Sequence, residues 1–179
     1  MQRLQTRLDG LVLLSPKVHG DERGFFVETF RADVASGYGI PVDFVQDNHS
    51  RSRRGVLRGL HYQVEHAQGK LVRVVVGEVF DVAVDLRRSS STFGRHVAVT
   101  LSEANRRMLW VPPGFAHGFV VVSEQAEFLY KTTDYWYPEH ERTLLWNDPA
   151  LGIAWPVAAP QLAPRDAAGT PLESAPTYA

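Results

Sequence analysis

The sequence predicts an all-β fold, a double-stranded β-helix of the jelly-roll type with a few short helices. Short runs rich in β-branched and aromatic residues recur along the chain, and each is closed by a turn containing Gly, Pro or Ser. Segments with helical character are few and short. The runs are too numerous for one open sheet, so two packed sheets are favoured, and the jelly roll is the version whose mouth holds a small ligand.

The predicted strands follow one another at short intervals. In chain order they span residues 24–30, 42–49, 56–63, 69–76, 78–86, 95–101, 107–111, 115–122 and 127–136. Run 78–86 alternates large apolar side chains with acidic or small ones, which predicts a strand buried on one face only. Residues 32–37 and the neighbourhood of residues 147–150 are the two segments expected to be helical.

Length, charge and composition restrict the classes of function. The 179 residues suit a single domain with one core, and 19 Lys and Arg against 20 Asp and Glu give no overall field toward nucleic acid or membrane. The absence of cysteine excludes disulfides, thiolate metal sites and a cysteine nucleophile. The apolar run 11–14 is too short for a signal peptide or a membrane span, so a cytoplasmic location is expected.

Residues 156–179 differ in composition from the rest of the chain. They are rich in Ala and Pro, which by itself is typical of a loose tail. Arg165 and Asp166 form the conspicuous charged pair of this segment.

The stretch GVLRGLHYQ, residues 55–63, places Arg58 and His61 inside a predicted strand. The ordinary pKa of histidine is about 6.5, so a small shift makes His61 a usable base at neutral pH. The alternative is a structural histidine bonded to a backbone carbonyl. Lys70 begins the next predicted strand, where its ammonium faces either a cavity or open water.

A metal site is the competing interpretation of the histidines. In jelly-roll proteins such a site commonly uses a His-x-His unit with a nearby carboxylate and a later histidine. Here Gln63 stands two positions after His61, whereas Glu65 and His66 fall in a turn. Since His61 and His117 alone make a weak ligand set, we expect no functional metal.

Strand parity indicates which side chains can share a face. Tyr130 and Trp136 have the same parity, as do Gln46 and Asn48. For each of these four side chains, an ordinary place in the core or at a turn is the alternative.

Arg58 and His61 have opposite parity. Both can face one site only if the strand alternation breaks between them, and Gly59 suits a bulge. Among the arginines, Arg58 and Arg23 are better placed for a bidentate anion contact than the basic loop at 51–54.

Four motifs, in this order, together resemble the dTDP-4-dehydrorhamnose 3,5-epimerase family: ERGFF at 22–26, GVLRGLHYQ at 55–63, PPGFAHGF at 112–119 and EFLYKTTDYW at 127–136. The resemblance covers nearly the whole chain. It implies a cupin-like jelly roll that inverts C3 and C5 of dTDP-4-keto-6-deoxy-D-glucose in dTDP-L-rhamnose biosynthesis, without metal or other cofactor.

The resemblance also implies a role for individual residues. His61 would be the base that removes a proton next to the ketone, Asp166 its partner, Lys70 the cation near the keto oxygen and Tyr130 the acid on the opposite face. The substrate-binding residues that it implies are Arg23, Glu28, Gln46, Asn48, Arg58, His117, Trp136 and Arg165.

Two structural expectations come with the family. Members are homodimers that exchange N-terminal strands, which would place Arg23 and Glu28 in the neighbouring subunit's site. The C-terminal segment, residues 156–179, would fold back on the site of its own chain.

The chain departs from the family pattern at two positions. Trp136 stands where many members have tyrosine, and His19 occupies a position that is often a carbocyclic aromatic residue. Relatives invert C3, C5 or both with almost the same residues. A mono-epimerase of another deoxysugar pathway and a non-catalytic sugar-nucleotide binding module are therefore the alternatives.

Overall fold

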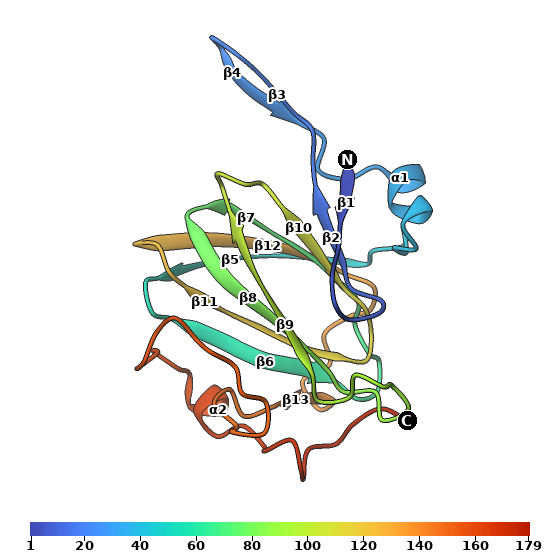
Figure 1. Ribbon diagram of the computed structural model, residues 1–179, viewed down its shortest axis with the longest axis vertical. Helices are drawn as coiled ribbons and strands as arrows, with labels where there is room; N and C mark the ends of the chain where they lie inside the picture. Colours follow the sequence, from blue (N-terminus) through green and yellow to red (C-terminus); the bar gives the residue numbers. More distant parts are fainter.

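Two antiparallel sheets packed face to face form the body of the molecule in the computed structural model, which describes residues 1–179 (Figure 1). The larger sheet has the spatial order β1 (Gln2–Leu4), β2 (Val12–Ser15), β10 (Met108–Val111), β7 (Lys70–Val76), β12 (Gln125–Thr132) and β5 (Gln46–Arg53). The smaller sheet has the order β13 (Glu141–Thr143), β6 (Leu57–Gln63), β11 (Phe115–Val121), β8 (Glu78–Asp85) and β9 (His96–Ser102). The predicted all-β jelly roll is confirmed.

Three further elements complete the chain. Strands β3 (Val18–Asp21) and β4 (Gly24–Val27) form a hairpin that projects from one end of the body (Figure 1). Helix α1 (Ala32–Gly37) has the bounds that were predicted, and helix α2 (Pro164–Ala167) lies beside the smaller sheet. Neither helix has the length and apolar character needed to cross a membrane.

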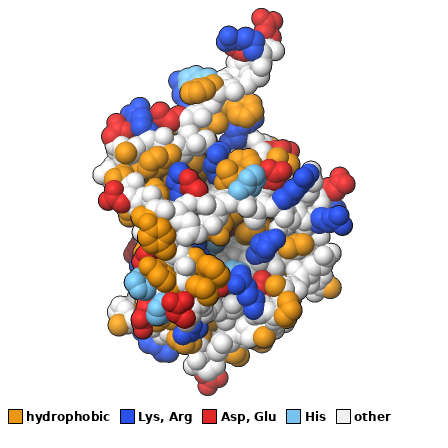
Figure 2. Space-filling view, turned by 180° about the vertical axis from the view of Figure 1, so that it is seen from behind, with side chains coloured by type: hydrophobic (Ala, Val, Ile, Leu, Met, Phe, Trp, Pro, Cys, Tyr) orange, Lys and Arg blue, Asp and Glu red, His pale blue; other side chains and the backbone are white.

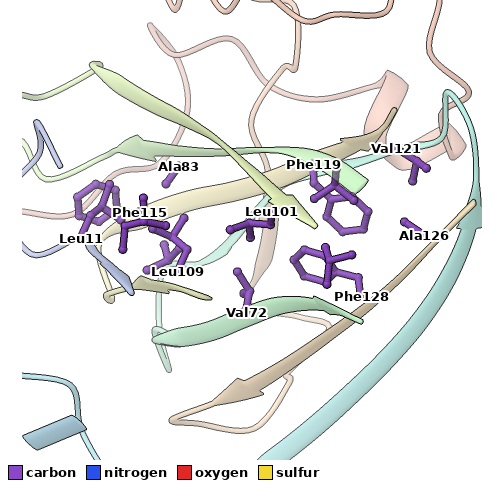
Figure 3. Packing of buried hydrophobic residues seen from close by; sticks show 14 of the residues in the cluster. Leu11, Val72, Ala83, Leu101, Leu109, Phe115, Phe119, Val121, Ala126 and Phe128 are labelled. Atoms are coloured by element: carbon purple, nitrogen blue, oxygen red, sulfur yellow. The ribbon is translucent and has the colours of Figure 1, made fainter. Parts of the chain in front are cut away.

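The main core lies between the facing surfaces of the two sheets. Val72 and Leu109 of the larger sheet and Leu101 of the smaller sheet belong to one cluster of 15 buried apolar residues (Figure 3). Phe119 of β11 stacks on Phe128 of β12, with ring centroids 4.2 Å apart. This stack joins the sheets close to the cavity described below.

Strand β8 is buried on both faces, so the prediction of a strand buried on one face only is wrong. Asp81 and Asp85 are fully enclosed because β8 lies between β9 and β11 and other segments cover both surfaces. Burial by itself would raise the pKa of Asp85, but hydrogen bonds from Arg87, Ser90 and Thr92 hold it below the ordinary range. Satisfied hydrogen bonds make a buried carboxylate tolerable.

Each predicted strand overlaps an observed one, with differences at the ends. The run at 42–49 contains a strand only from Gln46, and the run at 127–136 is strand only to Thr132, whose hydroxyl donates to the carbonyl of Asp134 and closes a turn. The short strands β1, β2, β3 and β13 were not predicted. Brief segments carry too few residues to show a period of two.

The helix expected near residues 147–150 is absent, and the segment is a turn. The Asp148 carboxylate accepts hydrogen bonds from the backbone of Ala150 and of Leu172, which fixes the turn against the C-terminal segment. Aspartate favours such local bonds over a helix interior. Helix α2 was missed, although Pro164 is suited to its first position.

Residues 156–179 are an ordered strap on the smaller sheet, not a loose tail. Backbone bridges join Gln161 to Val56, Thr170 to Leu144 and Tyr178 to Arg87. Ala175 and Tyr178 pack in a second apolar cluster on the outer face of this sheet. The Ala and Pro composition therefore reflects a chain that follows a surface without forming a sheet of its own.

Candidate active site

Two adjoining hollows open at the mouth formed by β5, β6, β7, β11, β12 and α2. One has a volume of about 240 Å³ and the other about 210 Å³. They share five lining residues, namely Asn48, His61, Lys70, Tyr130 and Arg165. The two hollows therefore form one continuous site, which the segment around α2 borders on one side.

His61 and Asp166 form a close pair in this site. His61 Nε2 lies 2.6 Å from Asp166 Oδ1, and the two side chains are 17% and 3% exposed. Asp166 of the C-terminal segment thus lies directly against His61. An ionised carboxylate can only accept a hydrogen bond, so Nε2 carries the proton and Nδ1 keeps the lone pair of a base.

A bulge in β6 turns Arg58 and His61 toward the same side. His61 pairs with His117 of β11, whereas Arg58 pairs with Phe119, so three residue steps on β6 face two on β11. Gly59 lies in the bulge with φ at 130°, a conformation that favours glycine. The bulge predicted at Gly59 is confirmed, and Arg58 and His61 both line the larger hollow.

Lys70 is the first residue of β7 and lines both hollows together with His61. Its Nζ donates to the His61 carbonyl oxygen at 3.4 Å. Burial lowers the pKa of Lys70 from 10.5 to about 8, and the carboxylates of Glu141 and Asp81 act in the opposite direction. Lys70 is thus an ammonium at neutral pH that sits in a site with little water around it, where its charge acts strongly.

Tyr130 belongs to β12, and its side chain lines both hollows. Burial raises the pKa of Tyr130 above its ordinary value, and the Glu141 carboxylate adds to the rise. The guanidinium groups of Arg58 and Arg165 oppose that rise. Tyr130 therefore keeps its proton at neutral pH and can donate it.

His117 has a carboxylate partner of its own. Its Nε2 lies 3.0 Å from both oxygens of Asp81, and both side chains are buried. Sequence reasoning missed Asp81 as a site residue because it was placed on the outer face of a half-buried strand. An acidic residue in the middle of an otherwise apolar strand was the signal that could have found it.

Three predicted binding residues, two amides and an indole, meet at the smaller hollow. Gln46 Nε2 donates to Asn48 Oδ1 at 3.0 Å, and the Trp136 backbone donates to Gln46 Oε1 at 3.1 Å. The Trp136 side chain is half exposed at the rim. Asn48 Nδ2 is buried without a hydrogen-bond partner, which leaves a donor free for a ligand.

Arg165 connects the C-terminal segment to the edge of the smaller sheet. Its Nη1 donates to Glu141 Oε2 at 2.7 Å, and its Nε lies 3.6 Å from Asp166 Oδ1. Glu141 lines the smaller hollow and was not singled out in the sequence. No sequence pattern marks it, since it begins a strand of only three residues that follows a polar turn.

Two predicted binding residues lie outside the site of their own chain. Arg23 is at the tip of the β3–β4 hairpin, where it pairs with Asp21 and is 86% exposed. Glu28 follows β4 and lies 4.0 Å from Arg31. In Figure 2 the hairpin carries charged side chains at its tip and hydrophobic ones nearer the body. His19 lies on the same hairpin.

The histidines and carboxylates of the site are not clustered as metal ligands would be. The structure brings together no group of three or more His, Asp or Glu side chains that could hold one. Since His61 and His117 each face a single carboxylate, the site's polar groups are arranged in pairs suited to proton transfer.

Comparisons with known proteins agree with this chemistry. A family model described as dTDP-4-dehydrorhamnose 3,5-epimerase matches residues 5–174. The chain is 59% identical to the dTDP-4-dehydrorhamnose 3,5-epimerase of Pseudomonas aeruginosa over 171 residues, which is 94% of each chain. It is 47% identical to that of Methanothermobacter thermautotrophicus over 178 residues, covering 98% of this chain and 96% of the relative.

Solved structures show the same fold. A dTDP-6-deoxy-D-glucose-3,5-epimerase from Legionella pneumophila, in complex with dTDP-4-keto-L-rhamnose, is 53% identical with a TM-score of 0.94, covering 97% of this chain and 93% of that chain. A 3'-monoepimerase from Streptomyces bikiniensis, in complex with dTDP-quinovose, is 31% identical with a TM-score of 0.89, covering 94% and 87%. The same fold therefore occurs in an enzyme named as a 3,5-epimerase and in one named as a 3'-monoepimerase.

Proposed function

The chain belongs to the dTDP-4-dehydrorhamnose 3,5-epimerase family, and from this we propose that it inverts C3 and C5 of dTDP-4-keto-6-deoxy-D-glucose, a step of dTDP-L-rhamnose biosynthesis. One observation carries the proposal: the His61–Asp166 pair shares a site with Lys70 and Tyr130. A binding site alone needs neither a base nor an acid.

Proton removal is the task of His61. Protons on carbons next to a ketone are weakly acidic, so a base must be held close to them and the developing enolate must be stabilised. His61 Nδ1 takes the proton, the C–H electron pair becomes the enolate double bond, and Asp166 stabilises the imidazolium that results. The partly exposed His61 then returns its proton to solvent.

Lys70 stabilises the negative charge that develops on the keto oxygen. A preorganised, buried ammonium contributes more to an enolate than to a neutral ketone, so it lowers the barrier rather than merely binding substrate. The pKa of Lys70 is lowered to about 8, so the ammonium loses its proton as the pH rises through that value. We therefore expect its stabilisation of the enolate, and with it the turnover rate, to fall over the same pH range.

Tyr130 completes each inversion by donating its proton to the opposite face of the enolate. The phenolate left behind regains a proton from solvent before the next cycle. Two groups on two sides of the sugar are required, because a single group would return the proton to the face from which it came. Tyr130 comes from the larger sheet and His61 from the smaller one, which supports this assignment.

Cationic and amide groups would hold the diphosphate and the nucleoside. Arg58 and Arg165 line the larger hollow and supply guanidinium groups, while Asn48 Nδ2 supplies an unpaired donor. The half-exposed indole ring of Trp136, at the rim of the hollow, would stack on the nucleobase of the substrate. Binding energy from these unreactive parts of the substrate would orient the sugar ring.

A second copy of the chain would supply Arg23 and Glu28. The hairpin that carries Arg23 projects from the body, and its Phe25 and Phe26 are 61% and 71% exposed. Adjacent exposed aromatic side chains of this kind favour burial against another surface. The homodimer with exchanged N-terminal strands and the cytoplasmic location remain predictions.

Incubation with dTDP-4-keto-6-deoxy-D-glucose in deuterated water, followed by NMR at C3 and C5, tests the proposal. Deuterium at both carbons with formation of the L-sugar is expected. Deuterium at one carbon would instead support a mono-epimerase, the activity of the Streptomyces bikiniensis relative. Deuterium at neither carbon, with dTDP still bound, would leave a binding module and overturn the assignment of His61 as a base.

A further inference from the structure

Gln63 is a buried polar side chain that the proposed reaction does not use. It stands two residues after His61 in a regularly paired part of β6, so both side chains lie on the same face of the strand. Gln63 is 3% exposed, but it lines neither hollow of the active site. A buried carboxamide needs hydrogen-bond partners for its polar atoms.

The partners of the Gln63 carboxamide are main-chain groups, and two of them flank Trp136. Gln63 Nε2 donates to the Tyr135 carbonyl at 3.2 Å and to the His66 carbonyl at 2.7 Å. Its Oε1 accepts a hydrogen bond from the Tyr137 N–H at 2.8 Å. A main-chain N–H only donates and a carbonyl only accepts, so these partners fix the orientation of the carboxamide. One side chain therefore holds the peptide groups on both sides of Trp136.

We propose that Gln63 is a positioning residue that fixes Trp136 at the rim of the active site, so that the indole ring is oriented for the nucleobase before the nucleotide binds. This inference rests on the proposed function and deepens it. Gln63 acts through the main chain around Trp136 and does not touch the substrate. A ring that is ordered in advance raises affinity, because binding no longer bears the cost of ordering it.

Few other hydrogen bonds hold the loop around Trp136. The start of the loop is held separately, since Gln68 Nε2 donates to the Asp134 carbonyl at 2.9 Å. At the centre, the Trp136 N–H donates to Gln46 Oε1 at 3.1 Å. The Trp136 side chain is half exposed, so packing restrains it only in part. Loss of the Gln63 carboxamide should therefore free the centre of the loop while its start stays in place.

A double-mutant cycle between Gln63 and Trp136 tests the inference. Gln63→Met keeps the approximate length of the side chain and removes all three hydrogen bonds, whereas Trp136→Ala removes the ring. Calorimetry with dTDP gives the Kd of the parent protein, both single variants and the double variant. Ser123→Ala is the control, because this hydroxyl bonds to the main chain of Glu78 and Gln125 and lines neither hollow.

In Gln63→Met the Kd for dTDP should rise about three- to tenfold, while kcat stays within about twofold. In Trp136→Ala the Kd should rise at least as much, since base stacking is lost. Adding Gln63→Met to Trp136→Ala should then cause little further loss, because the ring that Gln63 orients is gone. Ser123→Ala should bind dTDP like the parent. Parental affinity in Gln63→Met, or effects that multiply in the double variant, would overturn the inference.

NMR of the indole N–H signals gives a second readout that a general loss of stability would not produce. The chain has four tryptophans, and the Trp136 signal is assigned by its loss in Trp136→Ala. In Gln63→Met this signal should shift or broaden, whereas the other three keep their positions. Equal movement of all four signals would mean that Gln63 supports the fold at large, and the inference would be wrong.

Hydrogen exchange keeps the inference testable even if Gln63→Met does not fold. In the parent protein the Tyr137 amide should exchange more slowly than an exposed amide, because it donates to Gln63 Oε1. Gln63→Asn is one methylene shorter, so it should speed this exchange and weaken dTDP binding in parallel. Exchange of the Tyr137 amide that is fast in the parent, or unchanged in Gln63→Asn, would exclude the proposed role.

Binding of dTDP does not require turnover, so failure of the inference and failure of the proposed function are distinguishable. A parent protein that binds dTDP but incorporates no deuterium into the sugar would refute the proposed function alone. Normal deuterium incorporation by the parent, together with independent effects of Gln63→Met and Trp136→Ala on the Kd, would refute the inference alone.

Discussion

His61 Nε2 and Asp166 Oδ1 lie 2.6 Å apart, although 105 residues separate them along the chain. His61 is held by the bulged strand β6, and Asp166 is held by the short helix α2, which begins at Pro164. The pair therefore exists only if two independently formed elements meet. Its geometry fixes the ring orientation of His61 and leaves Nδ1 as the basic nitrogen.

Asp166→Asn should lower turnover about a hundredfold or more with little change in the affinity for dTDP. The amide keeps the size of the carboxylate, but it cannot stabilise an imidazolium and can hold the wrong tautomer of His61. Steady-state rates and calorimetric binding of dTDP measure the two effects separately. Asp33→Asn, which changes an exposed carboxylate paired with Arg31, is the control. Full turnover in Asp166→Asn would show that His61 works without this partner.

Gly59→Ala should destabilise the fold by about 3 kcal/mol or more. A Cβ at this position would come within 2.6 Å of the Gly118 Cα and 2.9 Å of the His117 carbonyl oxygen, and φ at 130° disfavours any side chain. The free energy of unfolding in urea measures the loss. Gly55→Ala is a matched control, because φ is also positive there but a Cβ meets no atom within 4 Å. Equal losses at both positions would mean that the bulge is not tightly packed.

Much of the fold could be predicted from the sequence because apolar alternation and turn residues are local signals. Every predicted strand overlaps an observed one, and α1 was found with its bounds. The strands at the edges of the two sheets were less predictable from the sequence. Strand β13 has three residues, and its position depends on pairing with β6 rather than on its own composition.

The site was predictable only where a motif carries it. His61 and Tyr130 stand in motifs that resemble the family, and the structure brings them to one cavity. Asp81 and Glu141 were missed, because their importance arises from which strands become neighbours. Parity along a single strand cannot show that Asp81 of β8 faces His117 of β11.

Lys70→Met should abolish turnover and change how stability depends on pH. In the folded protein the pKa of Lys70 is about 8, against 10.5 for an ordinary lysine. Below pH 8 both folded and unfolded chains carry the proton, so the parent protein bears the full cost of burying the ammonium. Between pH 8 and pH 10.5 the unfolded chain binds more protons than the folded one. The cost of burying Lys70 therefore decreases over this range, and the free energy of unfolding of the parent protein rises with pH.

Methionine carries no charge, so Lys70→Met should be more stable than the parent by about 2 kcal/mol at about pH 7, and the difference should shrink toward about pH 10. Chemical denaturation of both proteins across this range measures it. Lys131→Met, in which an exposed lysine paired with Asp47 is replaced, should show no comparable trend. A difference that stays constant with pH would mean that burial does not lower the pKa of Lys70.

Prolonged treatment with a chelator, followed by gel filtration, should leave turnover unchanged. The proposed proton transfers use His61, Lys70 and Tyr130, and no group of three or more His, Asp or Glu side chains is placed to hold a metal ion. The deuterium-exchange rate before and after treatment is the measurement. Loss of activity that one divalent ion restores would contradict His61 acting as a free base.

Co-expression of two differently tagged inactive chains should restore activity if the hairpin reaches a neighbouring copy. His61→Asn removes the base, and Arg23→Ala removes the proposed cation from the other subunit's site. In a mixed dimer, one site would then combine the intact His61 of one chain with the intact Arg23 of the other. About a quarter of all sites should regain parental turnover after random pairing, and about half in dimers purified through both tags. Two chains carrying His61→Asn serve as the inactive control. If Arg23 acted within its own chain, no site in a mixed dimer would be complete, and purified mixed dimers without activity would exclude the exchanged arrangement.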